Sequence, residues 1–439
     1  MGNGDVARDT IAAVATPPGK GGIGVVRVSG THAPRIAQAV LGTLPAPRHA
    51  TLASFRDALG EHIDQGIALY FPAPNSYTGE ALLELQGHGG PMVMQLLLRA
   101  CLDAGARLAE PGEFTRRAFL EGKLDLAQAE AVADLIDAAS REAARSALRS
   151  LSGEFSAAVD TLLAGLIELR ALTEAMLDFP EEEVDSLHRE DAASRLARLR
   201  GALDAVVAKS RQGSLLRAGI HAVLTGAPNV GKSSLLNRLA GEERAIVTPL
   251  PGTTRDSLRE PIELDGVPLV LVDTAGIRAA GDELERHGIA RTRQELQRAD
   301  LVLAVTEAGA PAPASADLPP EVARIAVYNK VDLVPGFVAP AGAVAVSAKT
   351  GEGLERLRKA ILKAAGWSST GESVFLARER HMRALGRAQV HLQAAMEQRD
   401  WEFFAEELRL AQEALASITG EFVADDLLGE IFARFCIGK

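Results

Sequence analysis

A glycine-rich segment near the middle of the 439-residue chain carries the strongest chemical signal. It reads G-A-P-N-V-G-K-S over residues 226–233, follows an apolar run, and precedes a stretch expected to be helical from Ser234 to Leu239. Glycines at this spacing let backbone N–H groups surround phosphate oxygens, and the following helix adds its N-terminal partial charge. Lys232 is expected to reach the β- and γ-phosphates, and Ser233 to ligate Mg²⁺. The segment predicts a nucleotide site formed by Asn229, Val230, Gly231, Lys232, Ser233 and Ser234.

Three shorter segments complete a guanine nucleotide site. Asp273-Thr274-Ala275-Gly276 could hold the Mg²⁺ shell through water and sense the γ-phosphate. In Asn329-Lys330-Val331-Asp332, the Asp332 carboxylate could accept from the ring N–H and exocyclic amine of guanine, a donor pair that adenine lacks. A backbone N–H of Ser347-Ala348-Lys349 could meet the guanine carbonyl. Each segment follows an apolar run, and the carboxyl ends of strands are where an open α/β sheet binds ligand. The set predicts binding of GTP and GDP.

The hydrolytic machinery is less clear from the residues. Ras-like enzymes orient the attacking water with a glutamine just after D-x-x-G, whereas this chain has Ile277 there. Another group must therefore handle the water. Acidic candidates are Asp282, Glu283 and Glu285, and Arg255 and Arg278 could approach phosphate, but a solvated charged loop explains each of them equally well.

Around these motifs, three regions of the chain differ in composition and in the periodicity of their apolar residues. Residues 1–123 mix strands, expected at 25–28 and 67–71, with a helix expected at 92–102, which indicates an α+β domain. Residues 124–216 and 371–439 have the composition of a helical bundle. Between them, residues 217–370 alternate apolar runs with helical stretches, which predicts a mostly parallel sheet in an α/β domain inserted into the helical one. The runs are His221–Thr225, Leu269–Asp273, Leu301–Val305, Ile325–Asn329 and Val344–Ser347.

Composition and net charge limit the binding partners and the cellular compartment that are expected. The formal charge of −11 argues against wholesale binding of nucleic acid by charge, although a local basic patch remains open. Two cysteines are too few for a disulfide framework and fit a reducing compartment. No apolar run is long enough to span a membrane and no secretory signal is evident, so a cytoplasmic protein is expected.

The chain resembles the MnmE (TrmE) family of tRNA-modification GTPases, within the TrmE-Era-EngA-like GTPases. The likeness rests on the phosphate loop, on I-V-T-P-L-P-G-T-T-R-D at 246–256 and on D-T-A-G-I-R at 273–278. The flanks agree, with E-L-Q-G-H-G-G at 84–90, P-G-E-F at 111–114, K-L-D-L-A-Q-A-E at 123–130 and F-C-I-G-K at 435–439. The resemblance covers essentially the whole length.

The resemblance implies a multidomain α/β architecture and a reaction. Residues 1–123 would bind tetrahydrofolate and form the homodimer, and a Ras-like G domain (217–370) would be inserted into a discontinuous helical domain. With a flavoprotein partner, MnmG (GidA), in a heterotetramer or larger complex, the family adds an aminomethyl or carboxymethylaminomethyl group to C5 of the wobble uridine of certain tRNAs. The one-carbon donor would be 5-formyl- or methylene-tetrahydrofolate, and G domains meeting across the dimer would hydrolyse GTP with Mg²⁺ and K⁺.

Roles carried over by matching position are also implied. Asn229, Thr248, Leu250 and Thr253 would coordinate K⁺, whose charge would replace an arginine finger. Thr254 would join Ser233 on Mg²⁺, and Glu285 would position the water through a bridging water. The folate positions are Arg27, Glu84, Lys123 and Lys439.

Two further residues have open interpretations. Cys436 could attack uridine C6 as a thiolate and activate C5, or it could be a small buried hydrophobe near the chain end. His88, between glycines, could serve chemistry or suit a tight turn. A regulatory switch that docks on ribosomes or membranes, and a folate enzyme with a vestigial G domain, are the competing functions. The folate positions and the C-terminus disfavour the first, and the intact guanine motifs disfavour the second.

Overall fold

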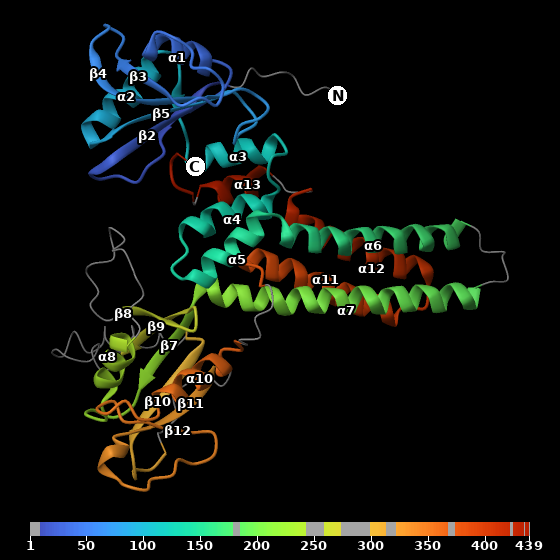
Figure 1. Ribbon diagram of the computed structural model, residues 1–439. Coiled ribbons are helices and arrows are strands. Elements are labelled where there is room, and N and C mark those ends of the chain that lie inside the picture. Colours follow the sequence, from blue (N-terminus) through green and yellow to red (C-terminus); the bar gives the residue numbers. More distant parts are fainter. Residues whose placement is uncertain are drawn as a thin grey trace, which may run out of the picture. The chain divides into compact units, whose positions relative to one another are not determined.

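The computed structural model describes residues 9–178, 185–242, 259–273, 299–312, 322–367, 374–421, 425–433 and 435–438. By packing, the chain divides into two compact units (Figure 1). The first comprises Met1–Ala133 and Ala416–Lys439, and the second comprises Asp134–Leu415. The predicted domain boundaries stay a prediction, since this division by packing separates two units rather than three domains.

The first unit contains a six-stranded sheet in the order β3-β4-β5-β2-β1-β6. Its neighbours pair antiparallel except β1 and β6, which are parallel. Val26 and Val28 are buried and Arg27 between them points to the opposite face, as the period of a strand requires. The strands are β1 (Ile11–Val14), β2 (Gly21–Ser29), β3 (Thr51–Arg56), β4 (His62–Phe71), β5 (Leu82–Gly89) and β6 (Arg107–Leu108).

Two helices, α1 (Ala33–Leu41) and α2 (Pro91–Asp103), pack their apolar stripes on the face that carries Val26 and Val28. The strands predicted at 25–28 and 67–71 and the helix predicted at 92–102 are confirmed. A second small core joins α4 (Leu126–Ile136) to α13 (Asp425–Phe432), with Phe435 after it, and α3 (Glu113–Leu120) adds Phe119. The last helix of the chain therefore packs in the same unit as the N-terminal sheet.

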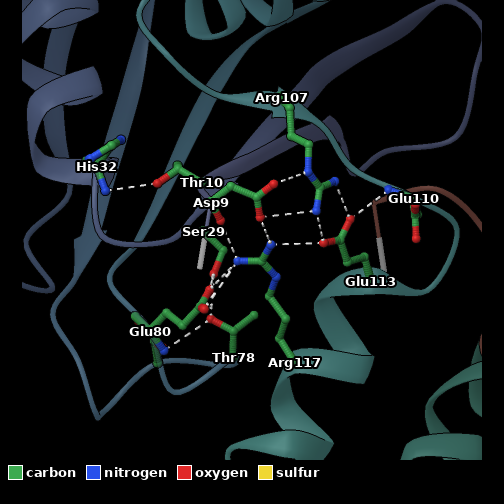
Figure 2. Close-up of polar contacts among 11 residues, drawn as sticks. Asp9, Thr10, Ser29, His32, Thr78, Glu80, Arg107, Glu110, Glu113 and Arg117 are labelled. Atoms are coloured by element: carbon green, nitrogen blue, oxygen red, sulfur yellow. Dashed lines mark hydrogen bonds and ion pairs between the residues drawn. The ribbon is translucent and has the colours of Figure 1, made fainter. Parts of the chain in front are cut away.

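A network of charged side chains, of which Arg117 and Glu113 are buried, surrounds the start of α3 in this unit (Figure 2). Arg117 is 5% exposed and donates to Glu113 at 2.9 Å, to Glu80 at 3.1 and 3.2 Å, and to Asp9. Arg107 donates to Glu113 at 2.6 and 2.8 Å and to Asp9 at 2.5 Å. Each guanidinium thus faces at least two carboxylates, and the arrangement ties the chain before β1 to β6, α3 and the segment before β5.

The same network lowers the pKa values of its acids. Burial opposes ionisation of Glu113, but hydrogen bonds from Arg107, from the N–H of Glu110 and from Arg117 outweigh it and lower its pKa. The hydrogen bond from Arg107 is the main cause of the lowered pKa of Asp9. Both carboxylates therefore stay charged in the folded protein down to a lower pH than in the unfolded chain.

The second unit contains the helical bundle, made of α5 (Arg141–Leu151), α6 (Glu154–Asp178), α7 (Asp185–Ala218), α11 (Glu379–Glu397) and most of α12 (Trp401–Thr419). Ser140 caps α5, because its hydroxyl accepts from the N–H of Ala143 at 3.1 Å. Helix α7 continues through Gly213 to Ala218, and Gly219, with φ +74°, turns the chain directly into the next strand. Within the residues that the structure describes, no helix is both long and apolar enough to cross a membrane.

Residues 219–367, the sheet domain, follow α7 and hold a sheet in the order β12-β11-β10-β7-β9-β8. All of its pairs are parallel except β8 with β9. The predicted mostly parallel α/β domain is confirmed, and β8, at the edge, was not predicted. Its elements are β7 (Ile220–Thr225), α8 (Lys232–Glu242), β8 (Arg259–Leu264), β9 (Val267–Asp273), β10 (Leu301–Glu307), β11 (Ala323–Asn329), a 3₁₀ turn η1 (Val331–Leu333), β12 (Val344–Ala345) and α10 (Leu354–Ala364).

We expect Glu113→Gln to lower the free energy of unfolding by about 2 kcal/mol at pH 7, because it replaces a buried carboxylate that accepts from Arg107 and Arg117 by a neutral amide, while Asp9 and Glu80 stay beside the two guanidinium groups. Both acids have lowered pKa values in the folded protein, so their contribution is complete above the ordinary values of 4.5 and 3.8 and is lost as pH falls through the lower folded values. Urea unfolding between pH 3 and 7 measures this, with the exposed Glu110→Gln as control. Equal stability losses in the two variants at pH 7 would contradict the role of the network.

Candidate nucleotide site and C-terminal cavity

The phosphate loop joins β7 to α8 in a shape that only certain residues allow. Gly226 and Gly231 have φ of +141° and +93°, and Asn229, a residue that tolerates this region, has φ +64°. A Cβ at Gly226 would lie 2.1 Å from the carbonyl oxygen of Val305 on β10. The loop therefore presents its backbone as the phosphate-binding motif requires.

Lys232 is the first residue of α8 and is only 5% exposed. Its Nζ donates to the carbonyl oxygens of Gly226 and Ala227 at 2.9 and 2.8 Å, which holds the ammonium inside the curve of the loop. Ser233 and Ser234 are exposed in the first turn of α8. The cation and the helix N-terminus thus converge where the sequence places the phosphates.

Asn329 links the phosphate loop to the base-recognition segments. It ends β11, is 1% exposed, and its Nδ2 donates to the carbonyl of Val230 at 2.9 Å. Its Oδ1 accepts from the N–H of Ala348 at 3.0 Å. The sequence predicted Asn329 as a nucleotide contact but gave no sign of this bridging role, because the two partners are distant along the chain.

Asp332 is oriented by a serine of the third predicted segment. The hydroxyl of Ser347, which is fully buried, donates to Asp332 Oδ1 at 2.6 Å and accepts from the N–H of Thr350 at 3.1 Å. Lys330 has φ +63° and pairs with Glu307 at the end of β10. The sequence analysis did not predict Glu307 as a site residue. Glu307 reaches the site because the pairing of β10 with β11 sets it opposite Asn329.

Several predicted positions lie outside the described residues: Thr248, Leu250, Thr253, Thr254, Thr274, Ala275, Gly276, Glu285 and Lys439. Asp273 ends β9 as expected. In the part of the chain that is described, no group of three His, Cys, Asp or Glu residues could hold a metal ion. The assignments of K⁺, Mg²⁺ and the water-positioning glutamate therefore stay predictions.

The first unit contains a cavity of about 1020 Å³. Its wall comes from the end of β1 and the loop after it, from Lys20, Gly21 and Ile23, from α2, and from Phe435, Cys436 and Ile437 of the C-terminus. The lining is mostly apolar, with Thr16, Lys20 and Gln95 among its polar members. A cavity of this volume is large enough for a cofactor-sized ligand.

The C-terminal tail reaches this cavity through two close backbone approaches. The N–H of Gly112 donates to the carbonyl of Cys436 at 3.4 Å, and a Cβ at Gly112 would lie 2.6 Å from the carbonyl oxygen of Phe432. A Cβ at Gly438, which has φ +96°, would lie 2.4 Å from the carbonyl oxygen of Val14. Cys436 is exposed at the wall, so the structure contradicts the interpretation of it as a buried hydrophobe.

The predicted folate residues Arg27, Glu84 and Lys123 lie in the same unit but are not among the residues that line this cavity, and the first two are paired. Arg27 donates from Nε and Nη2 to Glu84 Oε1 at 3.0 and 2.8 Å, and its Nη1 lies 3.5 Å from the carbonyl oxygen of Gly438. The guanidinium also faces the rings of Tyr77 and Phe114 at 5.6 and 5.8 Å. Lys123 follows α3 and its Cε lies near Gly79.

His88 is held in place but is not in a tight turn. It lies on β5 with a side chain 77% exposed, and its Nδ1 lies 2.8 Å from Asp64 Oδ1. Asp64 Oδ2 accepts from the N–H of His88 at 2.7 Å. Burial opposes ionisation of Asp64, but these hydrogen bonds outweigh it and lower its pKa.

Known proteins resemble this chain over almost its whole length. The description GTP-binding protein TrmE N-terminus matches residues 10–123, and MnmE helical domain matches residues 126–436. The tRNA modification GTPase MnmE of Azoarcus sp. (strain BH72) is 61% identical over 98% of this chain and 98% of its own. Those of Thiobacillus denitrificans and Dechloromonas aromatica are 58% and 56% identical, also over 98% of this chain, and cover 98% and 99% of their own.

The parallel sheet, the phosphate loop and the oriented Asp332 define a P-loop GTP-binding protein. At these identities and coverages, the chain belongs to the MnmE (TrmE) family. It is a GTP hydrolase that acts in tRNA modification.

Asp332→Asn should weaken GTP binding about a hundredfold, because an amide cannot accept both guanine donors as a carboxylate does. The same variant should bind xanthosine triphosphate more tightly than the parent protein does. Equilibrium dialysis measures the dissociation constants of both nucleotides for the parent protein and the variant. Unchanged GTP affinity would show that Asp332 does not contact the base.

Proposed function

We propose that the chain, with a flavoprotein partner of the MnmG (GidA) type, adds an aminomethyl or carboxymethylaminomethyl group to C5 of the wobble uridine of certain tRNAs. The one-carbon unit comes from 5-formyl- or methylene-tetrahydrofolate bound in the first unit by Arg27, Glu84, Lys123 and Lys439. The protein works in the cytoplasm as a homodimer, in a heterotetramer or larger complex with its partner.

The observation that carries this proposal is the exposed thiol of Cys436 on the wall of the 1020 Å³ cavity. A thiol beside a cofactor-sized cavity suits attack on an unsaturated ring carbon. The other cysteine offers no such chemistry, since burial raises the pKa of Cys101 to about 12. Arg27 and Glu84 do not line this cavity and pair with each other, and they could serve the folate as cation and carboxylate, the former for a glutamate tail and the latter for the N–H pair of a pterin.

The homodimer draws support from the open face of the first sheet. Leu52 and Ile67 face each other across β3 and β4 and are 70% and 40% exposed. Apolar side chains that adjoin on a sheet face favour burial against a partner. A second copy of the chain would cover them and bring two G domains into one assembly.

For hydrolysis, the proposed ions and residues act around the phosphate loop. Ser233 and Thr254 ligate Mg²⁺, and Asn229, Thr248, Leu250 and Thr253 coordinate K⁺. Glu285 positions the attacking water. Asn229 is exposed in the phosphate loop, so its side chain is accessible to an ion.

Replacing K⁺ by Na⁺ should lower GTP turnover at least tenfold in the parent protein, because Na⁺ prefers shorter ligand distances. Asn229→Gly, which removes the side chain and tolerates the positive φ of this position, should remove the difference between the salts while keeping GTP affinity within about threefold. The initial rates of GTP hydrolysis in matched chloride salts of K⁺ and Na⁺, with Cs⁺ and Rb⁺ as further controls, test this prediction. Equal parent rates in K⁺ and Na⁺ would remove the potassium assignment.

The function itself is tested by reconstitution with the flavoprotein partner, wobble-uridine tRNA, GTP and the folate. Omitting GTP or folate should each abolish the modified nucleoside seen by mass spectrometry. Cys436→Ser should abolish modification but leave GTP hydrolysis and retention of folate on gel filtration unchanged. Arg27→Ala should lose the folate. Modification at the parental rate without folate would overturn the proposed donor.

A further inference from the structure

The cavity of the first unit is lined in part by apolar side chains that the core leaves exposed. Ile23, Leu108 and Ile437 belong to this lining, and they are 68%, 51% and 51% exposed. They come from β2, from β6 and from the C-terminal tail, so the cavity wall joins three distant parts of the chain. Exposed apolar side chains that gather around one hollow mark a ligand site. The described residues that are predicted to bind folate do not line it.

The charge of this wall suits a ligand that carries a phosphate. None of the described residues that line the cavity is acidic, although the chain has a formal charge of −11. Lys20 is on the wall, and a Cβ at Gly19 or Gly22 on either side of it would meet no atom within 4 Å, so the loop leaves open space around this cation. A pterin or a guanine needs a carboxylate for its N–H pair, whereas a cation without a carboxylate favours an anion.

Two uncharged polar side chains of the wall can still form hydrogen bonds. The N–H of Val25 donates to the hydroxyl oxygen of Thr16 at 3.2 Å, which leaves the hydroxyl able to donate its own proton. Gln95 of α2 is exposed, and none of the described residues forms a hydrogen bond with its side-chain amide. An amide offers a donor and an acceptor side by side, the pair that matches the N3–H and a carbonyl oxygen of uracil. Phe435, also on the wall, offers an aromatic ring against which a base can stack.

The C-terminal tail links this cavity to the residues that are predicted to bind folate. Cys436 is exposed on the cavity wall, whereas the carbonyl oxygen of Gly438 lies 3.5 Å from Arg27 Nη1. Because Cys436 and Gly438 are two residues apart, their Cα atoms are at most about 7.6 Å from each other. A ring beside the thiol and a folate beside Arg27 would therefore be held next to the same short segment, as transfer of a carbon between them requires.

We propose that this cavity binds the wobble uridine nucleotide after it turns out of the stacked anticodon loop, an inference that rests on the proposed function. The uracil ring lies against Phe435, with C6 at Cys436. Its hydrogen-bonding edge meets Gln95 and Thr16, and its phosphate meets Lys20. Enzymes that react with a base take it out of the stack into a pocket of this kind and recognise its hydrogen-bonding edge there. Folate keeps its separate site.

Photo-crosslinking tests where the uridine binds. An anticodon stem-loop with 4-thiouridine at the wobble position is bound to the full chain and its flavoprotein partner and irradiated, and mass spectrometry of the digest identifies the attached residues. The cross-link is expected within residues 14–23, 91–98 or 435–437, which contain most of the cavity wall. Moving the 4-thiouridine into the stem should abolish it. Attachment only elsewhere, in this chain or in its partner, or no attachment at all, would overturn the proposal.

Fluorescence anisotropy measures the affinity of the full chain for the same stem-loop with either uridine or an abasic nucleotide at the wobble position. Gln95→Leu should weaken binding of the uridine RNA about tenfold and leave that of the abasic RNA within about twofold, because it removes a contact to the base. Lys20→Gln should weaken both about tenfold, because it removes a contact to phosphate. The matched controls Gln38→Leu and Arg99→Gln, at exposed positions outside the cavity, should change neither affinity. Equal effects of Gln95→Leu on the two RNAs would contradict the assignment.

Modification by the reconstituted system separates this proposal from the proposed function. At a low tRNA concentration, Gln95→Leu should lower the rate at which the modified nucleoside forms about tenfold. GTP hydrolysis and retention of folate, which do not use this cavity, check that the variant folds. Modification by Gln95→Leu at the parental rate would overturn the cavity assignment and leave the proposed function standing. A parent protein that modifies no uridine would overturn the proposed function, whereas the cross-link and the two affinities would still test the cavity.

Discussion

The nucleotide site depends on one buried amide. Asn329 must donate to the phosphate loop and accept from the segment that follows Ser347, and both bonds are made where the side chain is 1% exposed. Only an amide offers a donor and an acceptor at that length, so a carboxylate or an alkyl group would leave a buried backbone group unpaired. A Cβ at Gly231 would lie 2.3 Å from this amide, which explains the glycine there beyond its positive φ.

The strand order makes that amide's position possible. The phosphate loop follows β7 and the base-recognition segments follow β11 and β12, so all of them leave the sheet at the same carboxyl edge, with β10 between β7 and β11. The same register sets Glu307 beside Lys330. Phosphate binding and base recognition are thus both positioned by the same edge of one sheet.

In the first unit, buried charge supports an apolar cavity. The guanidinium groups of Arg107 and Arg117 hold Glu113 at the first turn of α3, and Gly112, just before it, accepts the approach of the C-terminal tail. The tail in turn places Cys436 at the cavity wall. The position of the thiol therefore rests on ionic contacts far from it in sequence, and on the absence of a side chain at Gly112 and Gly438.

Motifs made of residues that are close together in the sequence could be predicted from the sequence. The phosphate loop, the N-K-x-D segment and most strands of the sheet domain depend on residue types a few positions apart, and the structure confirms those described. Strand β8 was not predicted because R-E-P-I-E-L lacks an alternating apolar pattern. The strand tolerates its proline because it lies at the edge of the sheet. The double role of Asn329, the pairing of Arg27 with Glu84 and the presence of Gln95 and Cys436 on one cavity wall join residues far apart in the chain. No local pattern encodes such partners, because packing of whole elements brings them together.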